Sequence, residues 1–149
     1  MSDPISKIEL ILWTALEDGS GTDGHVYLGI AGREYAVKSQ GNYRDFQPHP
    51  EPDTYIFGEG ANINRPQDND PRTPWPTDAN DLTRCPMYIR FAPVGNDDNW
   101  QLQRADITVW FKGTAPNSIE QQVQFSRLSG GPRLWLGEQQ GQFLYFPLP

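Results

Sequence analysis

The residues best suited to ligand chemistry lie in one short stretch, Glu-Asp-Gly-Ser-Gly-Thr-Asp-Gly, at positions 17–24. Its two aspartates, Asp18 and Asp23, flank two glycines, a serine and a threonine. Carboxylate and carbonyl oxygens are the ligands that Ca²⁺ prefers, and a glycine-rich loop can turn its carbonyls inward. The same residue types also form turns in which a carboxylate accepts hydrogen bonds from its own backbone. The stretch is therefore a candidate calcium loop or a turn.

This stretch also has the Gly-x-Gly-x-x-Gly spacing of dinucleotide-binding loops, from Gly19 to Gly24. That fingerprint needs a following helix whose first turn receives the pyrophosphate. Residues 25–30 instead alternate in polarity and contain Gly29, which predicts a strand. We therefore reject nucleotide binding by this loop.

Few residues could support catalysis. Only His25 and His49 are bases that titrate near neutral pH when unperturbed. The sequence contains no nucleophile elbow and no metalloprotease helix motif, and a lone cysteine cannot form a two-cysteine zinc motif. That cysteine, Cys85, next to Pro86 at the start of a predicted strand, is typical of a small buried residue. We expect a protein that is not an enzyme.

The charge balance limits the partners. A formal charge of −7 and a pI near 4.7, with scattered Lys and Arg, argue against nucleic-acid binding, which needs clustered cations. The same deficit disfavours unaided binding to anionic lipid. A bridging divalent cation could reverse that preference locally.

The chain has no apolar run long enough for a transmembrane segment, and its start lacks the apolar core of a signal peptide. One cysteine allows no internal disulfide, which slightly favours a reducing interior. We expect a cytoplasmic protein, unless it is exported by a route that needs no leader.

The elements that must position these residues are predicted to be strands. Fourteen glycines and fourteen prolines indicate many turns, and no segment has a convincing helical pattern. The long strand at 100–111 changes phase at Gln103 and Arg104, which predicts a β-bulge. The last two strands flank a glycine-rich turn and are predicted to form a hairpin. The predicted strands cover residues 8–16, 25–30, 34–38, 54–57, 87–92, 100–111, 121–128, 134–136 and 142–146.

About eight such strands predict an all-β fold, an antiparallel β-sandwich of two sheets in a single domain, 1–149. Residues 45–84 form a long irregular loop, because seven prolines and eight acidic residues lie between Asp45 and Asp81. A loop of that length is typically functional or mobile. Residues 117–149 are expected to complete or extend the sandwich.

The chain resembles the PLAT family, the lipoxygenase-homology β-sandwich, over about residues 7–112. The likeness rests on the apolar first strand followed by Gly21-Thr22-Asp23-Gly24 and Val-x-Leu, and on Asn99-Trp100-Gln101-Leu102 leading into Ile107-Thr-Val. An aromatic stretch at 53–57 adds to it. Compared with a typical PLAT domain, the 45–84 loop is an insertion.

The resemblance implies calcium ligands in loops at one end of the sandwich, with Asp23 carried over first. One feature opposes this, because the turn after the second strand carries Arg33, and an arginine close to the site would repel a cation. The candidate ligands are Asp23, Asp18, the carbonyls of Gly19 and Gly21, and Asp97 and Asp98.

Among the tryptophans, Trp75 stands out because Thr-Pro-Trp-Pro cannot be a regular strand. A stiff loop of this kind could present the indole to a lipid interface or a partner, or fold it back over the sheet. Trp13, Trp100 and Trp110 lie in strand patterns and are expected to pack in the core or on a sheet.

Two classes of function follow. The resemblance implies a non-catalytic targeting module for lipid or membrane surfaces, with possible help from Ca²⁺. The alternative is a protein-interaction or structural module, such as an accessory subunit or an effector or toxin component, that uses the long acidic loop as its binding surface.

Overall fold

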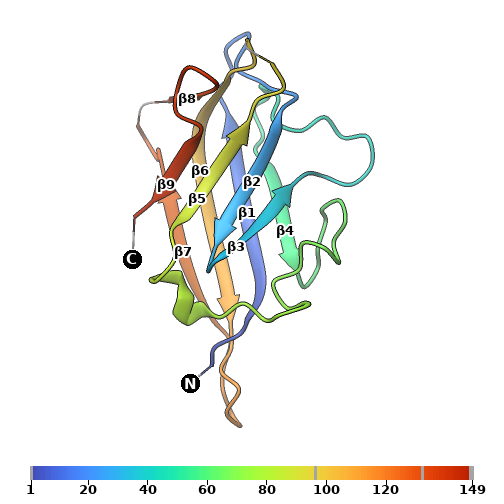
Figure 1. Cartoon of the computed structure of the whole chain (residues 1–149), viewed down its shortest axis with the longest axis vertical. Helices are drawn as coiled ribbons and strands as arrows, with labels where there is room; N and C mark the ends of the chain where they lie inside the picture. Colours follow the sequence, from blue (N-terminus) through green and yellow to red (C-terminus); the bar gives the residue numbers. More distant parts are fainter. Residues whose placement is uncertain (1, 96, 132, 148–149) are drawn as a thin grey trace.

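The computed structural model describes residues 2–95, 97–131 and 133–147, which form two antiparallel sheets packed face to face (Figure 1). One sheet has the order β4-β1-β6-β7, with β8 also paired to β6, and the other has the order β3-β2-β5-β9. The predicted all-β sandwich is confirmed. Within the described residues its strands are β1 (Ile5–Thr14), β2 (His25–Ile30), β3 (Arg33–Val37), β4 (Asp53–Gly58), β5 (Met87–Ala92), β6 (Trp100–Phe111), β7 (Gln121–Arg127), β8 (Leu134–Leu136) and β9 (Phe143–Phe146).

The two long strands β1 and β6 form the centre of the larger sheet. Leu10 pairs with Ile107, and both side chains are fully buried between the sheets. On the opposite face, the guanidinium of Arg104 lies 5.0 Å from the ring of Trp13. This cation–π contact covers part of an apolar outer surface, which explains why β1 is apolar on both faces.

The predicted β-bulge is present in β6. Trp13 pairs with Arg104, whereas Thr14 pairs with Leu102, so Gln103 is the extra residue. Leu102 and Ala105 are both fully buried although they differ in parity, because the bulge resets the alternation. The bulge keeps the beginning of β6 apolar on its inner side, where Trp100 is fully buried.

The predicted C-terminal hairpin is wrong. Strand β8 pairs with β6, and β9 pairs with β5 in the other sheet, so the intervening turn crosses between sheets. Leu136 and Leu144 are both buried in the shared core from opposite sides. Alternation within each strand predicts which side chains face inward, but it does not say which sheet edge the strand joins.

The 45–84 segment is irregular but firmly attached. It contains β4 and one 3₁₀ turn, η1 (Ala79–Leu82), whose N-cap Asp78 accepts a hydrogen bond of 2.9 Å from the Asn80 amide. Phe46 and Ile63 anchor it in the core. Helical structure in the described residues is limited to this turn, and no helix there has the length and apolarity to cross a membrane.

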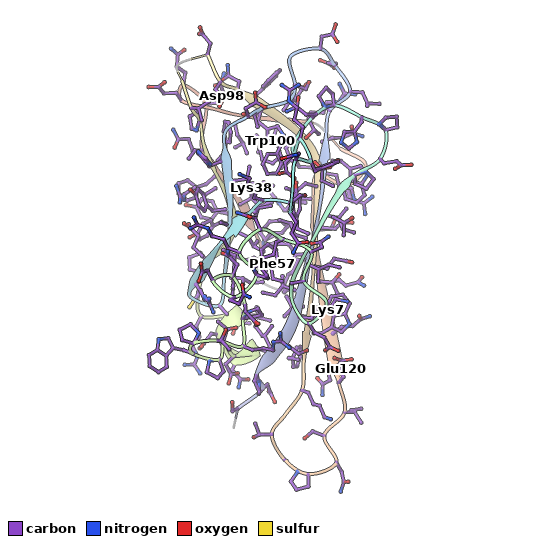
Figure 2. All side chains as sticks on the ribbon, turned by 90° about the vertical axis from the view of Figure 1, so that its right-hand side faces the viewer. Lys7, Lys38, Phe57, Asp98, Trp100 and Glu120 are labelled. Carbon is purple, nitrogen blue, oxygen red and sulfur yellow. The ribbon has the colours of Figure 1, made fainter. Side chains whose placement is uncertain are left out.

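The sandwich is elongated, with loops at its two ends (Figure 2). Asp98 lies near one end and Glu120 toward the other. We call the first the acidic end and define it as residues 15–24, 93–95 and 97–99, which follow β1 and precede β6.

Candidate functional site

Two loops of the acidic end are joined through one threonine. The hydroxyl of Thr22 donates a short hydrogen bond to Asp98, whose other carboxylate oxygen accepts from the Val94 amide at 2.9 Å. The Gly24 amide donates to the Thr22 oxygen at 2.9 Å. A Cβ on Gly24 would lie 2.7 Å from the Asp98 carboxylate, so only glycine permits this approach. Because Thr22 is buried, the junction is part of the fold.

A second junction holds the β1–β2 loop against β6. The hydroxyl of Ser20 donates to the side-chain oxygen of Gln101 at 2.9 Å, and both side chains are buried. The backbone amide of Gln101 also donates to the Ser20 carbonyl at 2.9 Å. Thr22, Ser20 and Gln101 were not predicted as site residues, although the first two lie within the Gly-Ser-Gly-Thr-Asp motif.

The predicted calcium ligands separate into two groups. Asp23, Asp97, Asp98 and the backbone of Gly21 line one open hollow at the acidic end. Asp18 and Gly19 lie farther along the β1–β2 loop and do not line it.

Two of the three carboxylates of the hollow, those of Asp23 and Asp98, already have partners within the protein. Asp23 forms an exposed ion pair with Arg44, with 3.3 Å between guanidinium and carboxylate, and accepts from Gln47 at 3.4 Å. Among the described residues, no three His, Cys, Asp or Glu side chains are arranged to hold a metal ion. The acidic end therefore offers separate carboxylates and leaves most of the six to eight oxygen ligands of Ca²⁺ to other sources.

The arginine near the predicted site is Arg44, not Arg33. The guanidinium of Arg33 donates to the backbone carbonyls of Asp70 and Thr73, at 2.5 and 2.7 Å, and so holds the loop that carries Trp75. The expectation that Arg33 lies close to the carboxylates is wrong, because the β2–β3 turn lies at the other end of β2 from the acidic end.

Trp75 and the acidic end occupy opposite ends of the sandwich. The Trp75 side chain is 78% exposed, so it does not fold back over the sheet. Its loop contacts the beginning of β1, where the Ile5 amide donates to the Thr77 carbonyl at 2.9 Å. Ten residues of strand span about 33 Å. Trp75 and Asp23 are therefore too far apart along the strands for both to contact a flat membrane whose plane is perpendicular to the strands.

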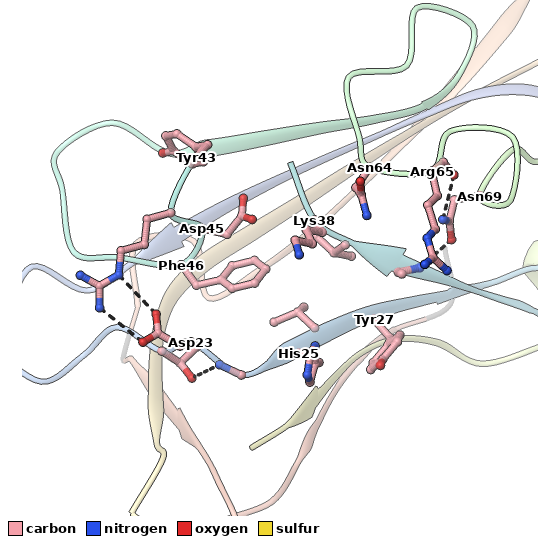
Figure 3. A pocket seen from close by; sticks show the side chains of 16 residues that line it. Asp23, His25, Tyr27, Lys38, Tyr43, Asp45, Phe46, Asn64, Arg65 and Asn69 are labelled. Atoms are coloured by element: carbon pink, nitrogen blue, oxygen red, sulfur yellow. Dashed lines mark hydrogen bonds and ion pairs between the residues drawn. The ribbon is translucent and has the colours of Figure 1, made fainter. Parts of the chain in front are cut away.

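A groove of about 450 Å³ lies beside the acidic end (Figure 3). It follows β2 and β3, and its other wall is formed by residues 43–46 together with Asn64, Arg65 and Asn69. Asp23 and Arg44 line both the groove and the hollow, so their ion pair lies between the two. In Figure 3, His25 and Tyr27 lie on one side of the groove, and Lys38, Asn64 and Arg65 on the other.

One buried carboxylate supports the groove wall. Asp53 is 5% exposed and accepts hydrogen bonds from the Phe46 amide at 3.0 Å and the Tyr43 hydroxyl at 2.5 Å. His49 lies 3.3 Å from the same carboxylate. Burial and the hydrogen bond to Asp53 raise the pKa of Tyr43 above its usual range. This carboxylate–histidine pair holds the 43–49 segment in place.

The outer face of the smaller sheet carries an aromatic cluster. The rings of Phe143 and Tyr145 are parallel within 5° with centroids 5.5 Å apart, and Tyr88 packs edge-on against both. Phe143 is 41% exposed and Tyr145 is 55% exposed. Beside them, the Arg90 guanidinium donates two hydrogen bonds to Glu34, at 2.6 and 3.0 Å.

The Glu34–Arg90 pair predicts a pH-dependent contribution to stability. The hydrogen bonds from Arg90 hold the pKa of Glu34 below its usual value of 4.5. Because the folded-state pKa is depressed, the pair stabilises the fold above about pH 4.5 and this stabilisation is lost as the pH falls through the folded-state pKa. We expect the stability gap between wild type and Glu34→Gln, measured by urea unfolding, to narrow toward low pH. A gap of the same size at every pH would contradict this.

The likeness of this chain to known proteins is structural. No family model matches the sequence, and a search of curated proteins finds no match. Among solved structures, the alpha toxin from Clostridium absonum superposes with a TM-score of 0.56 at 19% identity, over 99% of this chain and 32% of the toxin chain. The alpha-toxin of Clostridium perfringens from avian strain SWCP gives a TM-score of 0.48 at 19% identity, over 83% of this chain and 31% of the other.

The first likeness fits a PLAT-like fold. At 19% identity it concerns the fold alone, and the chain spans about a third of the toxin's length. The β-sandwich predicted from the strand pattern therefore has a counterpart among solved structures.

Proposed function

We propose that this PLAT-like chain is a non-catalytic module that binds lipid or membrane surfaces through its acidic end, assisted by Ca²⁺. Asp23, Asp97 and Asp98 are the residues that would share the ion with the lipid. Lipid phosphates and water would supply the oxygen ligands that the protein does not provide. The cation would also offset the repulsion between an acidic protein and anionic lipid.

The observation that carries this proposal is the presence of exposed aliphatic side chains beside the carboxylates. Leu16 is 57% exposed in the β1–β2 loop, and Val94 is 62% exposed in the β5–β6 loop. Apolar side chains next to an ion bridge would gain from entering the interfacial region of a bilayer. We infer that the module is non-catalytic because His49, the histidine that lies next to a carboxylate, contacts Asp53 and fixes the position of the 43–49 segment.

Calcium-dependent sedimentation with vesicles tests the proposal. With vesicles of phosphatidylcholine and phosphatidylserine, we expect wild type to pellet in the presence of Ca²⁺ and to remain in the supernatant with chelator. Asp23→Asn should reduce the pelleted fraction several-fold, since it removes one ligand charge. Its stability should hardly change, because exposed ion pairs contribute little.

The matched control is Asp68→Asn, which makes the same charge change at an exposed aspartate outside the acidic end. This variant should sediment like wild type. An equal loss in both variants would show a general charge effect and would contradict a role for Asp23.

The second candidate is a protein-interaction module, and the aromatic cluster of Tyr88, Phe143 and Tyr145 favours it. Exposed tyrosines next to an arginine are typical of the centres of protein interfaces. The same sedimentation assay separates the two candidates. A protein that ignores vesicles of every composition, with and without Ca²⁺, would favour the interaction module.

A further inference from the structure

The groove beside the acidic end contains cations without carboxylate partners. Lys38 and Arg65 both line it, and neither side chain forms an ion pair with any residue in the described part of the chain. Arg44, in contrast, is paired with Asp23. In a chain with a net charge of −7, unpaired cations that line one groove are available for a ligand of opposite charge.

The remaining carboxylate of the groove, Asp45, is also satisfied within the protein. It accepts hydrogen bonds from the Tyr55 hydroxyl at 2.7 Å and from the Ser39 amide at 3.2 Å. Asp23 and Asp45 therefore already have partners. In contrast, the Lys38 ammonium and the Arg65 guanidinium, which lie opposite His25 in Figure 3, form no hydrogen bond or ion pair within the described residues. The groove is arranged to receive an anion.

Two residues of the groove wall have a backbone conformation that residues other than glycine rarely adopt. Arg65 has a φ of 51° and Phe46 a φ of 62°, both in the left-handed region. The buried Asn69 fixes the backbone of Arg65. Its side-chain amide group donates to the Arg65 carbonyl at 3.1 Å, and its side-chain oxygen accepts from the Ala36 amide at 2.8 Å. The Asn64 amide donates to the Lys38 carbonyl at 2.8 Å.

These bonds fix the backbones that carry the two cations, so less ordering is needed when a ligand binds. Backbone strain that is held in place by buried hydrogen bonds is frequent at ligand sites. Two strained residues, Phe46 and Arg65, line this single groove.

We propose that the groove binds a phosphate monoester, with Lys38 and Arg65 as the principal ligands. A phosphate monoester carries close to two negative charges at neutral pH, which matches two unpaired cations, and its oxygens accept charge-assisted hydrogen bonds. The amide of Asn64 and the His25 ring line the same space and can contact the ester. The volume of about 450 Å³ suits a small phosphorylated molecule or a lipid headgroup. This site adjoins the calcium-dependent contact at the Asp23–Arg44 pair, but its principal ligands are different and it does not require Ca²⁺.

Titration with sn-glycerol 3-phosphate in the presence of chelator tests the proposal. In ¹H–¹⁵N correlation spectra, amide signals of residues 36–38, 64–65 and 67–69 should shift with a saturable profile. The double variant Lys38→Gln/Arg65→Gln should bind about tenfold more weakly or worse, because it removes both positive charges and their charge-assisted hydrogen bonds to the anion. Unchanged binding, or no shift in the wild-type groove, would overturn the proposal.

A matched double variant controls for charge. Lys112→Gln/Arg127→Gln removes the same two charges from exposed positions outside the groove, where neither side chain has an ion-pair partner among the described residues. This control should bind as wild type does. Equal weakening in both double variants would show non-specific attraction and would overturn the site.

A second arm identifies the source of the phosphate. Sedimentation in chelator with phosphatidylcholine vesicles, with and without phosphatidic acid, presents the same monoester on a membrane. Pelleting that depends on phosphatidic acid, and is lost in Lys38→Gln/Arg65→Gln, would support a headgroup ligand. Binding of soluble glycerol phosphate alone would support a free phosphorylated metabolite. Because Ca²⁺ is absent throughout, failure here is distinguishable from failure of the calcium-dependent contact.

Discussion

Replacing Trp100 with alanine is expected to lower the free energy of unfolding by about 3–5 kcal/mol, the usual cost of truncating a buried tryptophan. The Trp100 side chain is fully buried, and its indole nitrogen donates a hydrogen bond of 2.9 Å to the Thr14 hydroxyl. Its ring centroid lies 5.4 Å from that of Phe46 and 5.8 Å from that of Phe91. The truncation would leave a cavity between the two sheets and a buried hydroxyl without its donor.

Trp110→Ala is the matched control, because Trp110 lies on the outer face of the same strand under the ammonium of Lys7. That substitution removes a half-buried ring and a cation–π contact worth about 0.5–1 kcal/mol, so its cost should be clearly smaller. Urea unfolding followed by far-UV circular dichroism compares the two without depending on tryptophan fluorescence. Similar losses in both variants would contradict the central position of Trp100.

Trp100 also connects the core to the groove. Phe46 is part of the groove wall and packs on the indole. If the Trp100→Leu variant stays folded, it should therefore bind glycerol phosphate less tightly than wild type, because Phe46 would lose its packing contact with the indole. Packing in the core therefore keeps this wall rigid. The strained backbone conformations of Arg65 and Phe46 persist only when the surrounding structure holds them in place.

Local patterns in the sequence were sufficient for most of the fold. Alternation placed the strands, and the phase change at Gln103 revealed the bulge, because both depend only on neighbouring residues. The failure of the C-terminal hairpin has the opposite origin. Alternation predicts that Leu136 and Leu144 face inward whether the last two strands pair with each other or join different sheets. The choice of sheet depends on edges contributed by β5 and β6, which are distant in sequence.

The candidate site was less predictable, because its contacts join distant segments. Thr22 and Asp98 are separated by 76 residues, and Ser20 and Gln101 by 81. The sequence placed Asp23 and Asp98 at one end of the sandwich, but it could not show that Arg44 pairs with Asp23. The groove gave no sequence signal, since Lys38 and Arg65 are individually ordinary surface residues that only the 43–46 and 64–69 segments bring together.

Asp98→Ala is expected to damage the acidic end in two measurable ways. The substitution leaves the buried Thr22 hydroxyl without its acceptor and frees the Val94 amide, which should cost about 1–3 kcal/mol of unfolding free energy. It should also abolish calcium-dependent sedimentation with phosphatidylserine vesicles, because the loops carrying Leu16 and Val94 would no longer be joined. The stability effect should be independent of Ca²⁺, which separates the structural role from ion binding.

Asp97→Ala is the natural comparison, since it deletes a carboxylate at the neighbouring position. Asp97 is exposed and lines the same hollow, and no hydrogen bond or ion pair of its side chain occurs within the described residues. Its removal should leave stability within about 0.5 kcal/mol of wild type while weakening vesicle binding. If Asp97→Ala and Asp98→Ala were equally stable, the Thr22–Asp98 junction would not hold the loops. If both variants sedimented normally with Ca²⁺, the junction would be purely structural and the lipid contact would lie elsewhere on the molecule.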